Sequence, residues 1–204
     1  LKDIPYTGNK TAKEKLDFET RLRVFGYTQE DLKTLILPMC SSGKEAIGSM
    51  GTDTPLAVLS TKPQLLFNYF KQLFAQVTNP PLDGIREEIV TDTGLGIGSD
   101  FNIFDIVPDH CKKLKINNPI ISNEDLDKIK FIKNKNFKTA SVSALYDVIK
   151  GHNGIEEALD IMVKDVISFV DNGYNIIIIS DRGVSKEKGA IPILLACSNV
   201  HHVL

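Results

Sequence analysis

The spacing of apolar residues is most regular in the last third of the chain. Residues 138–145 alternate polar and apolar side chains, which is the period of a half-buried β-strand. Residues 175–180 form an almost unbroken apolar run, which predicts a central strand buried on both faces. Between them, residues 154–172 repeat apolar side chains every three or four positions and predict a helix. Its buried face comprises Ile155, Leu159, Met162, Val163, Val166, Phe169 and Val170.

The ends of this predicted helix–strand unit carry ordinary boundary signals. Asn172 and Gly173 are typical of a helix C-terminus, and Ile191-Pro192 opens a last helix that runs to the end of the sequence. A polar loop, residues 181–189, lies between the second strand and that helix. The order strand, helix, strand, helix predicts parallel strands joined by right-handed crossovers.

The first half of the chain has weaker patterns. Helices are predicted over residues 11–26 and from Thr28 onward, the second interrupted by Pro38. A Gly- and Ser-rich loop follows at 41–54, then a short buried strand at 56–59 and an aromatic-rich helix at 64–76. Residues 91–118 show little periodicity and are interpreted as an irregular excursion. After it, Ser122 or Asn123 caps a short helix.

These elements predict an α/β fold with a small, mostly parallel sheet and flanking helices, and leave open a relation to an incomplete (β/α) barrel. Two domains are expected. Residues 1–54 form a helical segment with the Gly/Ser loop packing on the main domain, and residues 55–204 form the α/β domain, including the excursion.

Composition narrows the class of protein. The net charge of −2 creates no field that would attract nucleic acid or an anionic membrane surface. The longest aliphatic run, residues 176–179, is far too short to span a bilayer. Three scattered cysteines without CxxC spacing argue against a metal site or a disulfide framework. We therefore expect an intracellular protein of a reducing compartment, in the cytoplasm or an organelle such as a plastid. Because Leu1 is not an initiator Met, the true N-terminus is expected to be missing.

A compact charged cluster follows the double proline at residues 80–81. At helical spacing Asp83, Arg86 and Glu87 share one face. Paired carboxylates can transfer protons, but an Arg between them stabilises their charged forms. The cluster therefore favours a structural or interdomain network over catalysis.

A second polar group, Ser180-Asp181-Arg182, comes directly after the predicted buried strand. Ligands gather at the carboxyl ends of parallel strands, so Asp181 and Arg182 could orient a substrate or a neighbouring backbone. The alternative interpretation is a local ion pair that closes the loop, since polar groups near a core need partners.

Three other motifs do not support a phosphate, dinucleotide or metal site. Residues 38–45 do not match a phosphate loop, because Pro38 and Glu45 occupy positions that need Gly and Ser or Thr. Residues 94–99 resemble a dinucleotide fingerprint but end in Ser and follow no strong strand. The adjacent His201 and His202 would point about 100° apart on a helix, which is poor geometry for chelation.

Several blocks of the sequence together resemble one family. They are residues 43–53, 55–60, 67–88, 119–124 and 175–182, and Ile191-Pro192-Ile193-Leu194-Leu195-Ala196 with His201-His202 behind it. In order and spacing they resemble the central domain of glutamate synthase over nearly the whole chain. Residues 91–106 depart most from the family pattern.

The resemblance implies a connecting domain of an oxidoreductase of glutamate biosynthesis. The family's enzymes hydrolyse glutamine at an N-terminal cysteine and pass the ammonia through a tunnel to an FMN domain. There it reacts with 2-oxoglutarate, and an iron–sulfur cluster supplies electrons for reduction to glutamate. The implied partners are the amidotransferase and FMN-binding domains of the same polypeptide, with no nucleic acid or membrane.

By the same resemblance, no residue of this chain is catalytic, FMN-binding or cluster-binding. The surfaces expected to face neighbouring domains or the tunnel include ten candidate residues: Gly48, Gly51, Thr78, Asn79, Asp83, Arg86, Glu87, Ser180, Asp181 and Arg182. Two rival functions stay open. One is a stand-alone α/β module that binds a small anion at the loop after Ile179. The other is an autonomous hydrolase that uses His110 or His152 with a nearby carboxylate.

Overall fold

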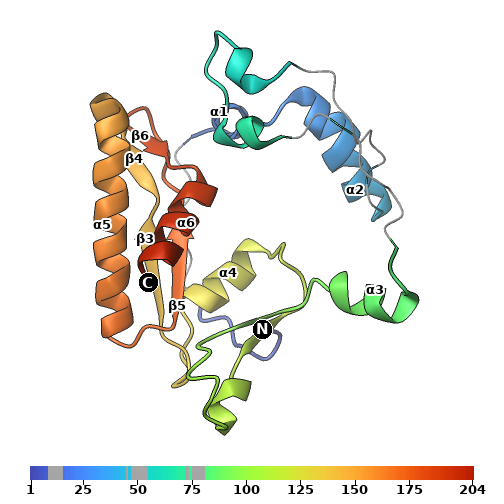
Figure 1. The fold of residues 1–204 in the computed structure, drawn as a ribbon, viewed down its shortest axis with the longest axis vertical. Helices are drawn as coiled ribbons and strands as arrows, with labels where there is room; N and C mark the ends of the chain where they lie inside the picture. Colours follow the sequence, from blue (N-terminus) through green and yellow to red (C-terminus); the bar gives the residue numbers. More distant parts are fainter. Residues whose placement is uncertain (9–15, 45, 47–54, 72–73, 75–80) are drawn as a thin grey trace. The chain divides into compact units, whose positions relative to one another are not determined.

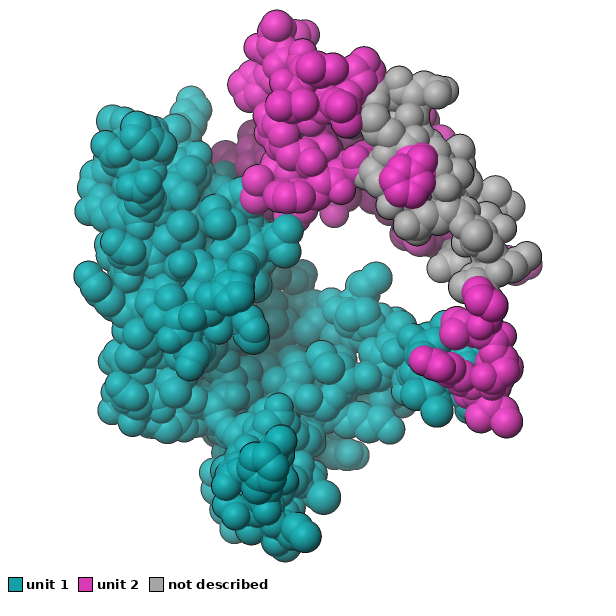
Figure 2. All heavy atoms as spheres, in the orientation of Figure 1, with its two compact units in different colours: residues 1–15, 87–204 teal, residues 16–86 magenta. Residues whose placement is uncertain are grey.

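A computed structural model describes residues 1–8, 16–44, 46, 55–71, 74 and 81–204. Backbone contacts divide the chain into two compact units, residues 1–15 with 87–204 and residues 16–86, coloured separately in Figure 2. The expected division into residues 1–54 and 55–204 stays a prediction.

The larger unit is built on a parallel pair of strands. β3 (Thr139–Ser143) pairs with β5 (Ile176–Ser180) along their whole length, in the register Thr139↔Ile176 to Ser143↔Ser180. The 21-residue helix α5 (Gly151–Asp171) connects them, and α6 (Ile193–Val203) follows (Figure 1). Gly173, at φ 78°, terminates α5, because this left-handed conformation suits Gly. The parallel strands and both helices of the sequence analysis are therefore confirmed.

The first of these strands changes partner part-way along. The Ala144 N–H donates to the Ser180 carbonyl at 2.8 Å, while its own carbonyl accepts from the Ile191 N–H at 2.8 Å. Beyond Ala144, β4 (Leu145–Asp147) pairs antiparallel with β6 (Lys188–Ala190). The short strand β6 was not part of the sequence prediction, which placed a polar loop there.

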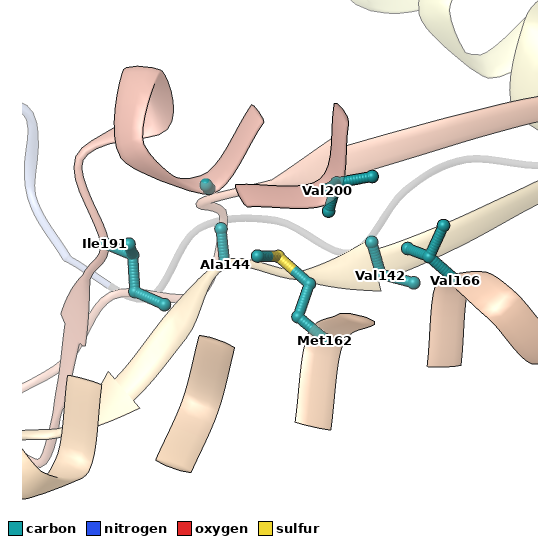
Figure 3. Packing of buried hydrophobic residues seen from close by; sticks show 7 residues of the cluster. Val142, Ala144, Met162, Val166, Ile191 and Val200 are labelled. Carbon is teal, nitrogen blue, oxygen red and sulfur yellow. The ribbon is translucent and has the colours of Figure 1, made fainter. Parts of the chain in front are cut away.

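The main core lies on one face of the parallel pair. Met162 and Val166 of α5 and Val200 of α6 gather around Val142 of β3 (Figure 3), and Ala196 of α6 belongs to the same cluster. Ile177 and Ile179 of β5 pack against the same cluster. Met162 and Val166 are the centre of the face predicted for the long helix, and each is only 1% exposed.

A second cluster covers the opposite face. Ile176 and Ile178 of β5 contact a layer formed by β2 (Leu114–Ile116) and α4 (Asn123–Lys130). β2 pairs antiparallel with β1 (Leu95–Ile97), and a 3-10 turn, Pro108–Cys111, precedes it. The predicted cap of α4 is confirmed, because the Ser122 Oγ accepts the Asp125 N–H at 3.1 Å. The strand pair β1–β2 is absent from the prediction of an irregular excursion.

The α/β class with a small parallel sheet and flanking helices is confirmed. The described residues form three two-stranded ladders, one parallel and two antiparallel, and close no barrel. None of the helices described here is both long and apolar enough to cross a membrane.

The unit of residues 16–86 consists of short helical segments. α1 (Phe18–Val24) begins after Asp17, whose carboxylate accepts the Thr20 N–H at 3.0 Å. A π-helical stretch, Asp31–Ile36, runs directly into α2 (Leu37–Ser42). Two 3-10 turns follow, Ala57–Leu59 and Leu66–Phe70, and then α3 (Gly84–Val90).

Three sequence predictions are wrong in this region. Residues 56–59 form an exposed 3-10 turn and not a buried strand. The expected aromatic helix, as far as it is described, is a single 3-10 segment that ends at Phe70, because Lys71 is extended. Pro38 does not interrupt its helix. It occupies the first turn of α2, where its missing N–H is tolerated after the wider π turn.

Candidate functional site

The residues predicted to face other domains fall into three groups. Gly48, Gly51, Thr78 and Asn79 lie outside the described residues. Asp83, Arg86 and Glu87 lie at the start of α3, and Ser180, Asp181 and Arg182 follow β5. In the described part of the chain, each of the last two groups has a defined set of contacts.

Asp83 acts as the N-terminal cap of α3. Its Oδ1 accepts the backbone N–H of Ile85 at 3.1 Å and of Arg86 at 2.9 Å. A carboxylate at this position satisfies N–H groups that have no partner inside the helix and faces the positive end of its dipole. The contact between Asp83 and Arg86 therefore runs through the backbone. No ion pair between the described side chains of Asp83, Arg86 and Glu87 occurs.

The helix that Asp83 caps is exposed on all sides. Arg86 and Glu87 are solvent-accessible, and the backbone carbonyl of Glu87 accepts from Thr91 at the C-terminal end. Ile85 and Ile89, one turn apart on the same face, are 81% and 73% exposed. This short helix thus presents a charged side and an apolar side to solvent.

The loop after β5 is tied to α4. The Arg182 guanidinium donates to the Asn123 Oδ1 at 2.6 Å, and the Arg182 N–H donates to the Ser180 Oγ at 3.3 Å. Arg182 thus bridges two elements 59 residues apart in sequence. Within the described residues no ion pair joins Asp181 to Arg182, so the local ion pair of the alternative interpretation is not formed. Ser180, Asp181 and Arg182 are half-buried.

A surface that the sequence analysis missed lies between β1 and β2. We call residues 100–107 the apolar loop. Phe104 is 87% exposed and Ile106 is fully exposed, and Phe101 and Ile103 also point largely into solvent. Scattered exposed apolar residues are normal, but consecutive ones on a single loop indicate an interaction surface.

The base of the apolar loop is held by polar contacts. The Lys113 Nζ donates to the carbonyls of Gly98 and Ser99 at 3.1 and 2.7 Å and pairs with the Asp100 carboxylate. This hydrogen bond and the lysine's charge hold the pKa of Asp100 below its ordinary value. The loop is thereby anchored where it leaves and rejoins the β1–β2 pair.

Contacts within the apolar loop fix its shape. The Asn102 amide donates to the Asp105 carboxylate at 2.9 Å, and the His110 Nε2 meets the Asp105 carbonyl at 2.7 Å. The His110 ring also packs edge-on against Phe101, whose φ of 35° is rare for an aromatic residue. These contacts connect the loop to its base while its apolar side chains point into solvent. His110, a candidate base of the rival hydrolase, contacts a backbone carbonyl here.

Metal-ligating residues are dispersed. Among the described residues, no group of three His, Cys, Asp or Glu side chains could hold a metal ion. Cys40, Cys111 and Cys197 are exposed and unpaired. His201 and His202 lie in the last turn of α6, with their ring centroids 5.5 Å apart. His152 is exposed in the first turn of α5.

Comparison with known sequences identifies the family to which this chain belongs. A family model described as "Glutamate synthase central domain" matches residues 20–204. The chain belongs to the glutamate synthase central domain family. The resemblance noted in the sequence is therefore confirmed over nine tenths of the chain.

Members of the family in distant organisms are similar to this chain. Ferredoxin-dependent glutamate synthase 2 of Synechocystis is 42% identical over 88% of this chain and 12% of its own length. The NADPH glutamate synthase large chain of Bacillus subtilis is 38% identical over 92% and 12%. The NADH glutamate synthase of Schizosaccharomyces pombe is 36% identical over 99% and 9%. The chain thus spans about a tenth of the length of these curated relatives.

Proposed function

We propose that this chain is the connecting domain of a glutamate synthase. The whole enzyme would form glutamate from 2-oxoglutarate and glutamine-derived ammonia by reductive amination. This segment would bridge the amidotransferase and FMN-binding domains and help to shape the path of ammonia, without catalysis of its own. The relatives' names and the small share of their length that the chain covers support this role.

The apolar loop is the observation that carries the bridging role. A domain that worked alone would lose solubility by holding several large apolar side chains fully in water on an anchored loop. A domain that packs against others needs such side chains, because buried apolar anchors supply most of the binding energy at an interface. The exposed pair Ile85 and Ile89 on α3 fits the same requirement.

The cysteines of this chain do not fit the ligand set of an iron–sulfur cluster. An iron–sulfur cluster needs several cysteine thiolates at one place, whereas the three cysteines here lie on separate elements. We therefore assign the cluster to other parts of the polypeptide, and by the family resemblance the FMN as well. The free thiols also favour a reducing compartment.

Paired polar groups support a place beside the ammonia path. Ammonia is small and polar, and an unpaired carboxylate in its path would hold it as ammonium. Arg182 is held by Asn123 and Asp83 by backbone N–H groups, so these two of the candidate charges have fixed partners. Gly48, Gly51, Thr78 and Asn79 remain proposed as surfaces that face the neighbouring domains.

Coupling in the full-length enzyme tests this function. The double variant Phe104→Ser, Ile106→Ser should fold normally and hydrolyse glutamine, but form fewer glutamates per glutamine consumed. Ile149→Ser is the matched control, because Ile149 is 88% exposed but lies away from the apolar loop in sequence, in the 3-10 turn Val148–Lys150 between β4 and α5. Unchanged coupling in the double variant, or equal loss in the control, would count against the proposed role of the apolar loop.

A further inference from the structure

The outer edge of β5 has no partner among the described residues. In the parallel ladder with β3, the even-numbered residues of β5 point their backbone groups inward: the Ile176 N–H donates to Lys138, and the Ser180 carbonyl accepts from Ala144. Because backbone groups alternate along a strand, those of Ile177 and Ile179 point to the opposite edge. Within the described part of the chain they make no hydrogen bond.

The side chains of β5 are those of an interior strand. Ile177 and Ile179 pack against the α5–α6 core, while Ile176 and Ile178 pack against the layer of β2 and α4. A continuous apolar run covered on both faces is typical of a strand inside a parallel sheet. Edge strands are normally short, charged or interrupted by Pro, because an unpaired apolar edge promotes aggregation. β5 has none of these protections at residues 176–179.

The positions of the helices indicate where a further strand would lie. α5 and α6 share one core with Val142, Ile177 and Ile179, whose side chains lie on one face of the parallel pair (Figure 3). The right-handed crossover from β3 through α5 leads to β5. A second right-handed crossover through α6, on the same face, must advance in the same direction. The next strand would therefore lie beside β5, on the side away from β3.

We propose that the free edge of β5 is completed by a parallel strand that follows α6 in the longer polypeptide. This strand would accept and donate hydrogen bonds at Ile177 and Ile179. The inference rests on the proposed function only in taking the partner strand from the same polypeptide.

Hydrogen exchange of the full-length enzyme tests the pairing directly. If the strand is present, the amides of Ile177 and Ile179 exchange as slowly as the inward-facing amides of Ile178 and Ser180. If the edge is free, they exchange at least about tenfold faster than those neighbours. Protection that falls on dilution would identify a second copy of the chain as the partner and would overturn the proposal.

Proline substitution supplies an independent readout. Ile178→Pro removes an N–H that faces β3, whereas Ile177→Pro removes one that faces the outer edge. After subtraction of the effects of Ile178→Ala and Ile177→Ala, the proposal predicts equal loss of melting temperature for both prolines. A free edge predicts that only Ile178→Pro is harmful. Neither readout depends on glutamine or glutamate turnover, so failure here is distinguishable from failure of the proposed function.

Discussion

The β3–α5–β5–α6 region and the unit of residues 16–86 have similar shares of apolar residues but bury them very differently. In the first, Met162, Val166 and Ala196 are removed from water almost completely. In the second, none of the described residues is buried, and Phe67, Phe70 and Phe74 are largely exposed. Apolar content alone therefore does not make a core. It makes one only where the periodicity lets two elements face each other.

The difference in burial distinguishes apolar residues that form a region's own core from apolar residues that are available to other parts of a polypeptide. The strand–helix region stabilises itself, because each apolar side of one element meets another element of the same region. The apolar residues of 16–86 and of the apolar loop are exposed or only half-buried in the described part of the chain. Interfaces with other parts of a long polypeptide are the natural use of such surfaces.

Removal of a core side chain should produce the largest effect. Met162→Ala creates a cavity between α5 and α6 and should cost about 2–5 kcal/mol. Phe70→Ala, at a side chain 72% exposed in this structure, should cost no more than about 0.5 kcal/mol of the domain's own stability. Local stability is measured by hydrogen exchange of peptides from each region. Equal losses of stability in Met162→Ala and Phe70→Ala would contradict the distinction between the two regions.

Two glycine substitutions should change stability in opposite directions, one in the packed α5 and one in the exposed α3. A Cβ at Gly154 would lie 2.5 Å from the Asp147 carbonyl oxygen, so Gly154→Ala should destabilise the start of α5 by about 1–3 kcal/mol. A Cβ at Gly84 would meet nothing within 4 Å, and Gly84→Ala should stabilise α3 by about 0.4–1 kcal/mol. Denaturation midpoints of the two variants check the opposite signs. A stable Gly154→Ala variant would show that α5 and β4 are less closely packed than described.

The cap of α3 tests whether an exposed helix needs its local contacts. Asp83→Ala removes the acceptor of two N–H groups and should loosen α3 by about 1 kcal/mol. Asp83→Asn keeps an acceptor and should preserve most of the helix. In the full-length enzyme, loss of α3 should also lower the glutamate formed per glutamine hydrolysed, as should Arg86→Ala. Normal coupling in Asp83→Ala with a loosened helix would remove α3 from the bridging surface.

The smallest expected effect is a pH dependence of the anchoring of the apolar loop. The pKa of Asp100 is lowered in the folded protein, chiefly by its hydrogen bond to Lys113, so its contribution is present above the ordinary aspartate pKa. That contribution is lost as the pH falls through the lowered value, below about 4. After correction for the intrinsic pH dependence of amide exchange, the protection of amides in residues 98–107 should therefore fall in acid, and Lys113→Met should show the lower protection already at neutral pH. Identical exchange in variant and wild type at pH 7 would contradict this anchoring.

The sequence predicted the strand–helix region because the information there is local. The period of residues 154–172 identifies α5, and the apolar run of β5 identifies a strand buried on both faces. The prediction failed at residues 56–59, where a short apolar run that no described residue buries folds as an exposed turn. Short apolar runs are ambiguous in this way, because only tertiary contacts decide their structure.

The candidate site was predictable only in part. The position of Arg182 at the end of a parallel strand follows from sequence, but its partner Asn123 lies 59 residues away and could not be inferred. The apolar loop left a faint signal, namely Phe101, Ile103, Phe104 and Ile106 within a few positions. Nothing in that spacing distinguishes side chains that enter a core from side chains that are held out in solvent by Lys113 and His110.

Hydroxyl-radical footprinting of the full-length enzyme tests the central claim most directly. If the exposed apolar surfaces of this domain are interfaces, Phe67, Phe70 and Phe104 should be oxidised at least about tenfold more slowly than solvent-exposed phenylalanines, approaching the protection of the buried Met162. If these three aromatic side chains are oxidised at the rate of free surface residues in the intact enzyme, the domain does not bridge its neighbours through them, and the account is wrong.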